Sequence, residues 1–376
     1  ADYRIYPKQF KNEKVLLNLL QSAVSVKVPN GDLLLDNADD WKKIFGISAH
    51  QGVNTVLLDA IEHLQDNLRP KNPLLMRWVG QTMMQEQTYE HHKAQITLLA
   101  DILSKHDIKI LLLKGYGCSL NYPVPRHRPT GDIDIYLFGK QANGDRIVEQ
   151  ELGIKVHREY HKHSTFDFNG VEVENHAKFI DDMSHKSNIR FEQVLMQTLT
   201  QYPCIKSPIA NVLLPSPTFN ALFLLRHTGE HFASNEITLR HILDVGTFFR
   251  RFHSEIDWNV VFGEYKQERM MDFFNGIATI CISHLGFSPD CFTSDDKSYS
   301  YKTELALADR ILEDIFIKKK QLPMSTNDIK TIWQKYTYML EKSSRWWHNR
   351  WKYKLIYNEN LIESFLWLAK NRLRSF

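Results

Sequence analysis

The chain has few cysteines and no long apolar run. Its four cysteines include no Cys-x-x-Cys pair, so the sequence predicts neither a disulfide framework nor a structural zinc site, and it fits a reducing compartment. No apolar run approaches the roughly 20 residues that cross a bilayer, and the polar opening Ala1–Arg4 lacks the apolar segment of a signal peptide. We therefore expect a cytoplasmic protein with no transmembrane segment. The cysteines are Cys118, Cys204, Cys281 and Cys291.

The chain also lacks internal repeats, low-complexity segments and a strong excess of charge of one sign. With 43% hydrophobic and 24% charged residues among 376, it has the composition of a globular protein with two or three subdomains. The net charge of +3 is unevenly spread, because residues 318–376 hold 13 Lys and Arg against 4 Asp and Glu, together with five of the eight tryptophans.

Aromatic rings and cations cluster in residues 345–354, from Arg345 to Lys354. Such a segment suits a membrane interface or stacking on single-stranded nucleic acid. It also suits the rim of a core, where rings complete the packing and Lys or Arg stems cover it. We favour this structural interpretation, and peripheral membrane contact through the basic aromatic region stays open beside it.

The most informative pattern is a pair of aspartates two residues apart. Asp132 and Asp134 alternate with Ile133 and Ile135 in a stretch that reads as a strand. Successive side chains on a strand point to opposite faces, so both carboxylates project together while the isoleucines pack into a core behind them. Such a pair is often only the solvated side of an amphipathic sheet, but the flanking residues favour a platform that binds a divalent metal.

A second acidic strand follows about forty residues later in the chain. Phe166–Phe168 and Val171–Glu174 alternate on either side of Asn169-Gly170, which is the pattern of a two-residue hairpin. Glu172 and Glu174 share a face of this hairpin. If the strand lies beside the aspartate strand, three carboxylates could hold two ions that stabilise the attacking and leaving oxygens of a phosphoryl transfer. Hard oxygen ligands of this kind select Mg²⁺ or Mn²⁺.

Cations and glycines flank the acidic pair. Arg126, His127 and Arg128 precede it and could neutralise triphosphate oxygens. Gly115 and Gly117 follow an apolar run and precede a short helical segment, so this turn would expose backbone N–H groups to an anion. Together these features favour phosphoryl or nucleotidyl transfer.

The residues that carry these features resemble a known family. The resemblance rests on Leu113-Lys114-Gly115, Tyr122-Pro123, Arg128-Pro129-Thr130-Gly131-Asp132-Ile133-Asp134 and Val173-Glu174-Asn175-His176. These runs are similar to the uncharacterised bacterial nucleotidyltransferases of the DNA polymerase β-like superfamily. The resemblance implies an α+β fold with a small mixed sheet flanked by helices. It also implies transfer of a nucleoside monophosphate from a nucleoside triphosphate such as ATP to an acceptor hydroxyl, with Mg²⁺ or Mn²⁺ and release of pyrophosphate.

Carried across residue by residue, the resemblance implies a catalytic and metal-binding trio. Asp132 and Asp134 are the metal pair, and Glu174 is the third carboxylate. Gly115 lies in the phosphate turn, and His176 closes the third-carboxylate motif. The match is specific over residues 108–180 and weaker elsewhere.

Three further residues near the core are expected to bind the nucleotide. Lys114 and Arg128 would hold phosphates, and Ser119 lies four residues after the glycine of the turn. The wider superfamily has Gly-Ser or Gly-Gly at this turn, so the serine's role is either absent here or filled by Lys114.

A helical motif further along the chain also resembles the family. His227 and His231 are four residues apart and share a helix face, as do Arg240 and Asp244. The resemblance implies that these residues contact the nucleotide. Zinc binding by the histidines and a merely structural, partly buried histidine pair are the alternatives.

Departures from the family pattern keep other functions open. The third carboxylate is Glu where the superfamily often has Asp, and Glu172 competes with Glu174, which we prefer for its motif match. A catalytically degenerate nucleotide-binding or partner-binding module on the same fold is one alternative. An Asp-x-Asp glycosyltransferase is another, although the region before Ile108 reads as helical and not as a nucleotide-binding domain. The acceptor is open, with a sugar or other small molecule favoured over protein or RNA.

Hydrophobic spacing divides the chain into three regions. We expect an N-terminal helical region at 1–106, a nucleotidyltransferase core at 107–200 and a C-terminal helical domain at 201–376. After the prolines between 203 and 217 the pattern is helical to the end. In the core we expect strands at Ile108–Leu113, Asp132–Phe138 and Ile154–Tyr160 and a helix at Gly144–Leu152, before the hairpin.

Overall fold

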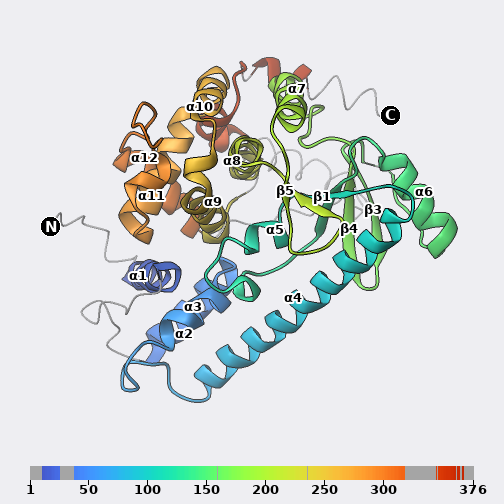
Figure 1. The fold of residues 1–376 in the computed structure, drawn as a ribbon. Helices are drawn as coiled ribbons and strands as arrows, with labels where there is room; N and C mark the ends of the chain where they lie inside the picture. The colour runs from blue at the N-terminus through green and yellow to red at the C-terminus, as the bar shows by residue number, and fades with distance from the viewer. Residues whose placement is uncertain are drawn as a thin grey trace, which may run out of the picture.

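The fold is α+β, as the sequence predicts, and combines a six-stranded mixed sheet with flanking helices (Figure 1). The computed structural model describes residues 11–25, 38–158, 160–234, 236–317, 344, 346–360, 362–364 and 366–367. None of the helices in these ranges has the length and apolar character needed to cross a membrane. All four cysteines are free.

The sheet has the strand order β3-β4-β2-β1-β6-β5. Neighbours β3/β4, β1/β2 and β5/β6 are antiparallel, whereas β2/β4 and β1/β6 are parallel. The hairpin forms with the expected two-residue connection, and both Asn169 and Gly170 have positive φ, as a tight primed turn requires. The strands are β1 Ile110–Leu112, β2 Ile133–Tyr136, β3 His163–Phe168, β4 Val171–His176, β5 Ile205–Lys206 and β6 Val212–Leu214.

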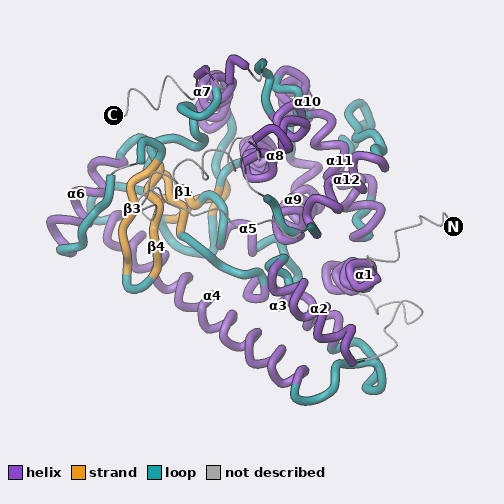
Figure 2. Tube along the Cα trace, turned by 180° about the vertical axis from the view of Figure 1, so that it is seen from behind, coloured by secondary structure: helices purple, strands orange, loops and turns teal. Residues whose placement is uncertain are grey.

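The two faces of the sheet pack against different parts of the chain. Ile133 and Ile135 are buried in a core with residues of helices α4 (Leu74–Ser104) and α6 (Gln141–Leu152). Figure 2 shows α4 running past the sheet on this side. On the other face, Tyr136 packs on Phe179, which in turn packs on α8 (Pro217–Ser234). The alternation of β2 therefore sends its isoleucines and its aspartate to opposite layers, as expected.

The N-terminal helices share one hydrophobic core with the C-terminal helices, although the two regions lie far apart in sequence. Gln51 joins them, because its amide donates to the Ile315 carbonyl and its side-chain oxygen accepts from the Leu239 N–H, both at 3.0 Å. The helices involved are α1 Lys11–Ser25, α2 Ala38–His50, α3 Asn54–Ile61, α9 Leu239–Phe252, α10 Trp258–Gln267, α11 Met271–Leu285 and α12 Leu305–Phe316. The remaining helices are α5 Tyr116–Ser119, α7 Lys186–Gln201, η3 Pro125–His127, η4 His253–Glu255 and η5 Pro289–Phe292.

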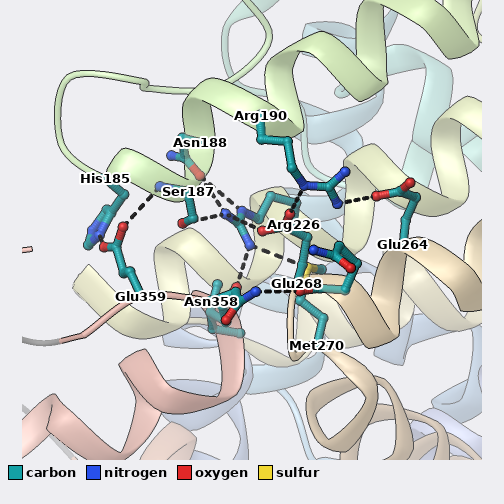
Figure 3. Close-up of polar contacts among 12 residues, drawn as sticks. His185, Ser187, Asn188, Arg190, Arg226, Glu264, Glu268, Met270, Asn358 and Glu359 are labelled. Carbon is teal, nitrogen blue, oxygen red and sulfur yellow. Dashed lines mark hydrogen bonds and ion pairs between the residues drawn. The ribbon is translucent and has the colours of Figure 1, made fainter.

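A buried polar network ties the segment after residue 345 to α7 and α8 (Figure 3). Arg226 of α8 is fully buried and donates to the Asn188 side chain at 2.6 Å and to the Ile356 carbonyl. Glu359 accepts from the Ser187 N–H at 2.9 Å and lies beside His185. These contacts fix the described end of the chain against the helical layer.

The described part of the aromatic segment, residues 346–354, is divided between the core and the surface: Trp351 and Tyr353 are partly buried against the core, whereas His348, Arg350 and Lys354 are exposed. The Trp351 ring lies 5.4 Å from the Phe232 ring, and Lys352 is fully buried and paired with Asp314. Trp347 is 58% exposed. Arg345, which the sequence analysis included, lies outside the described residues.

Two expectations about strands are wrong. Residues 154–158 do not form the expected strand and contribute only an isolated bridge between His157 and Thr165. Strands β5 and β6 lie in the region that the sequence analysis took as helical. Each spans at most three residues, so neither is long enough to display the alternation by which a strand is recognised.

Candidate active site

Three carboxylates gather on the sheet face that looks toward α8. Parallel pairing of β2 with β4 places Asp134 directly beside Glu174, and Asp132 lies on the same face, one residue before β2 begins. Asp134 is 5% exposed, Glu174 is partly buried and Asp132 is exposed at the rim. Glu172 lies further along the hairpin, opposite Asp167 and exposed. The pairing thus brings Glu174, and not Glu172, next to Asp134.

Lys114 places a cation against this acidic face. It follows β1, and its Nζ lies 2.7 Å from Asp134 Oδ1. Burial opposes its charge, but the neighbouring Asp134 and Glu174 carboxylates outweigh burial, so the pKa of Lys114 is raised. The ammonium group is therefore held charged inside the site.

The pKa values of the three carboxylates shift in different directions. Desolvation and then the charges of Glu174 and Asp134 raise the pKa of Asp132. Burial opposes ionisation of Asp134 and Glu174, yet the pKa of each is lowered, by Lys114 and His176 at Asp134 and by the adjacent imidazoles at Glu174. A divalent cation would offset the repulsion that Asp132 experiences from Asp134 and Glu174, and a set of three carboxylates fits Mg²⁺ or Mn²⁺.

Two histidines border Glu174. His176, on β4, is 1% exposed, and its Nε2 lies 3.0 Å from Asp134 Oδ1 and 3.3 Å from Glu174 Oε2. His163, on β3, has its Nδ1 2.9 Å from the same Glu174 oxygen. His176 was predicted from the sequence, whereas His163 was not. The signal was available, because a two-residue turn at Asn169-Gly170 fixes the hairpin register, which pairs His163 with His176.

The turn after β1 opens onto a small hollow beside the aspartates. Gly115 has φ +51°, and a Cβ there would lie 3.3 Å from the Asp132 carbonyl oxygen, so the tight turn depends on glycine. The hollow is lined by Lys114, Gly115, Asp132, Asp134 and Thr130, among others. The Thr130 hydroxyl is buried there with no hydrogen-bond partner. A ligand oxygen in the hollow would supply that partner.

Histidines of α8 face Lys114 across the site. Burial, followed by the charge of Lys114, lowers the pKa of His227 far below its usual value and that of His231 to about 4. The two rings lie 4.5 Å apart, and His231 lies 5.6 Å from the ring of His241 on α9. Arg240, whose pKa is lowered by burial and by the charge of Arg128, completes this side. Its Nε is buried without a hydrogen-bond partner. This wall therefore combines neutral imidazoles with cations.

Three of the predicted nucleotide-binding residues have other partners. Arg128 is 5% exposed and forms a bidentate pair with Asp244, with distances of 3.0 and 2.8 Å. Tyr122 also donates to Asp244, at 2.8 Å. Ser119 is fully buried, and its hydroxyl donates to the Tyr116 carbonyl. These side chains join the core to α9 or fill it, and their contact with the nucleotide stays a prediction. Of the predicted residues, Lys114 and Gly115 lie beside the aspartates. His227 and His231 lie close enough to Lys114 for its charge to lower their pKa values, and Arg240 lies near Arg128 and Asp244.

A family model described as "Uncharacterised nucleotidyltransferase" matches residues 37–286, about two thirds of the chain. The match contains the sheet, the three carboxylates and helices α8 and α9. No curated protein and no solved structure matches the chain.

Proposed function

The chain belongs to this family of uncharacterised nucleotidyltransferases, and on that basis we propose that it is a metal-dependent enzyme. It transfers a nucleoside monophosphate from a nucleoside triphosphate to an acceptor hydroxyl. The acceptor oxygen attacks the α-phosphorus, the bond from that phosphorus to the bridging oxygen breaks, and pyrophosphate leaves. The hydroxyl proton passes to a carboxylate oxygen of the site.

One observation carries the proposal: Asp134 and Glu174 are in register on neighbouring parallel strands, with Asp132 on the same face and Lys114 against them. Carboxylates arranged in this way can share divalent ions, which when bound would offset the charge on the transferred phosphoryl group and on the leaving pyrophosphate. Asp132, Asp134 and Glu174 are the residues that would hold them.

The remaining residues of the site bind and orient. The Lys114 ammonium group is the cation closest to the carboxylates and suits phosphate oxygens. Gly115 lets the backbone of the turn approach a phosphate. Neutral His227 and His231 offer ring nitrogens that can accept or donate a hydrogen bond without adding charge. The buried Arg240 beside them is a second candidate cation for the triphosphate.

Calorimetric titration of the protein with each nucleoside triphosphate, with and without Mg²⁺, tests the site. Asp132→Asn is the primary variant, because the exposed side chain at the rim can be changed with little effect on the fold. Glu172→Gln is its matched control. It removes an exposed carboxylate of the β3–β4 hairpin that lies opposite Asp167 in the neighbouring strand. We expect metal-dependent triphosphate binding that Glu172→Gln retains and Asp132→Asn weakens.

Transfer is then followed with a triphosphate labelled at the α-phosphate and a panel of hydroxyl acceptors, sugars first. Labelled product and pyrophosphate from the wild type, absent with Asp132→Asn, support the proposal. Near-normal turnover by Asp132→Asn would refute the assignment of Asp132 as a metal ligand of the transferase. Tight nucleotide binding without pyrophosphate release across the panel would favour the degenerate binding module.

A further inference from the structure

Two histidines and a carboxylate converge beside the three proposed Mg²⁺ ligands. One ligand atom from each of His163, Glu174 and His176 lies within 4.8 Å of the other two. The Glu174 oxygen is 2.9 Å from His163 Nδ1 and 3.3 Å from His176 Nε2, and Asp134 Oδ1 lies 3.0 Å from that same Nε2. Two donors bound to one ion at about 2.1 Å each lie roughly 3.0–3.4 Å apart. The separations of 3.0 and 3.3 Å lie in that range, and the separation of 2.9 Å lies just below it.

His176 lies between a backbone carbonyl and the carboxylates. Its Nδ1 lies 3.0 Å from the Lys178 carbonyl oxygen, which can only accept a hydrogen bond, so Nδ1 carries a hydrogen. Its Nε2 faces Asp134 Oδ1 at 3.0 Å and Glu174 Oε2 at 3.3 Å. A metal ion bound at this point would take the place of a proton between Nε2 and these oxygens. An imidazole whose second nitrogen donates to a carbonyl is also the usual arrangement of a metal-bound histidine.

His163 supplies a second, independent sign of a missing partner. Its side chain is 13% exposed, and its Nδ1 is buried with no hydrogen-bond partner, although Glu174 is close. The ring lies 5.1 Å from the His176 ring at an interplanar angle of 68°. A buried ring nitrogen without a hydrogen bond costs free energy unless another group binds it. A metal ion bound next to Glu174 would be that group.

We propose that His163, Glu174 and His176, with Asp134 at their edge, form a site for a first-row transition-metal cation. Two imidazoles and a carboxylate match the donor preferences of Zn²⁺, Fe²⁺ and Co²⁺, whereas Mg²⁺ prefers oxygen ligands and water. The site shares Glu174 with the proposed transferase site, and its use in catalysis rests on that proposed function. Under this proposal, one of the two cations of the transferase site is a transition metal bound partly by nitrogen, and the other is Mg²⁺ bound by oxygen.

The test uses the full-length, chelator-treated protein and Co²⁺ as the probe. Equilibrium dialysis with metal analysis gives the affinity and stoichiometry, visible absorption reports the ligand field, and pulsed EPR of bound Mn²⁺ detects coupling to ¹⁴N. We expect one Co²⁺ per chain, bound at least about a hundredfold more tightly than Mg²⁺, and ¹⁴N coupling in the Mn²⁺ form. His163→Gln should lower the Co²⁺ affinity about tenfold or more.

His161→Ala is the matched control. His161 lies next to Asp181 and Asp182, in a second group with metal-like spacing. The His161→Ala substitution should leave Co²⁺ binding at the proposed site unchanged. His163→Asp restores a ligand but replaces nitrogen by oxygen, so it should recover binding and shift the preference toward Mg²⁺. A merely structural role for His163 would not produce that shift.

Three outcomes would each overturn the inference: equal affinity for Co²⁺ and Mg²⁺, absence of ¹⁴N coupling, or loss of Co²⁺ binding only in His161→Ala. In each case a proton on His176, and not a metal ion, would form the contact with the Asp134 and Glu174 oxygens. Failure of the proposed function is distinguishable: Co²⁺ would still bind, but no triphosphate would bind with Mg²⁺. Conversely, Mg²⁺-dependent triphosphate binding without a Co²⁺ signal would refute the metal site alone.

Discussion

Replacing Asp244 by alanine should unfold the protein more easily, and should not act by removing a nucleotide contact. Asp244 is 8% exposed and accepts two hydrogen bonds from Arg128, at 3.0 and 2.8 Å, and one from Tyr122 at 2.8 Å. Removing one partner of a buried ion pair costs about 3–5 kcal/mol, because the other charge stays buried without compensation. We therefore expect the free energy of unfolding to fall by about 3–5 kcal/mol, a large part of the roughly 5–15 kcal/mol of a typical domain.

Urea unfolding followed by circular dichroism measures this loss. Asp66→Ala is the control, since Asp66 is 94% exposed and its pair with Arg69 at 3.1 Å lies at the surface. Surface pairs contribute about 0–1 kcal/mol, so this variant should be close to the wild type. An Asp244→Ala protein with unchanged unfolding free energy but no triphosphate binding would refute the reasoning. It would restore Asp244 to the nucleotide contacts that the sequence analysis expected.

Three further predictions concern the turn, the central cation and the histidine wall. Gly115→Ala should destabilise the protein more than Gly139→Ala, measured by thermal unfolding, because both glycines have positive φ but only at Gly115 would a Cβ meet another backbone oxygen. Lys114→Met should weaken triphosphate binding by about ten- to a hundredfold, the value of a charge-assisted hydrogen bond, while Lys140→Met, at an exposed lysine, should leave the dissociation constant unchanged. The pKa of His231 is about 4 in the fold against an ordinary 6.5, so the unfolded chain binds the extra proton and stability should fall as the pH drops from 6.5 toward 4. His231→Asn should flatten that part of the stability curve, and an unaltered slope would contradict the assignment.

Local patterns in the sequence predicted the parts of the site that lie on single strands. The alternation around Asp134 required its carboxylate and the flanking isoleucines to occupy opposite faces, and the structure places them so. The dipeptide Asn169-Gly170 required a tight hairpin, which fixes the strand register. That register is sufficient to place His163 opposite His176, although His163 was not among the predicted site residues.

The partners of the charged side chains could not be predicted in the same way. Arg128 lies close to the aspartates in sequence and was expected to hold phosphate, yet it pairs with Asp244, which is 116 residues away. His227 and His231 are distant in sequence but face Lys114 across the site. An arginine beside an acidic strand carries the same local signal whether its partner is a ligand or a helix of the same chain.

The sequence by itself determined the hairpin and, on each strand, the face on which its carboxylates project, because these follow from side-chain periodicity and turn chemistry within a few residues. The α+β class was implied by the resemblance to the nucleotidyltransferase family. Tertiary structure alone decided that β4 lies beside β2, in the register that places Glu174 next to Asp134, and that the helices from both ends of the chain share one core. Those outcomes depend on contacts between segments far apart in the chain, where burial and charge pairing are settled by the packing of the whole molecule.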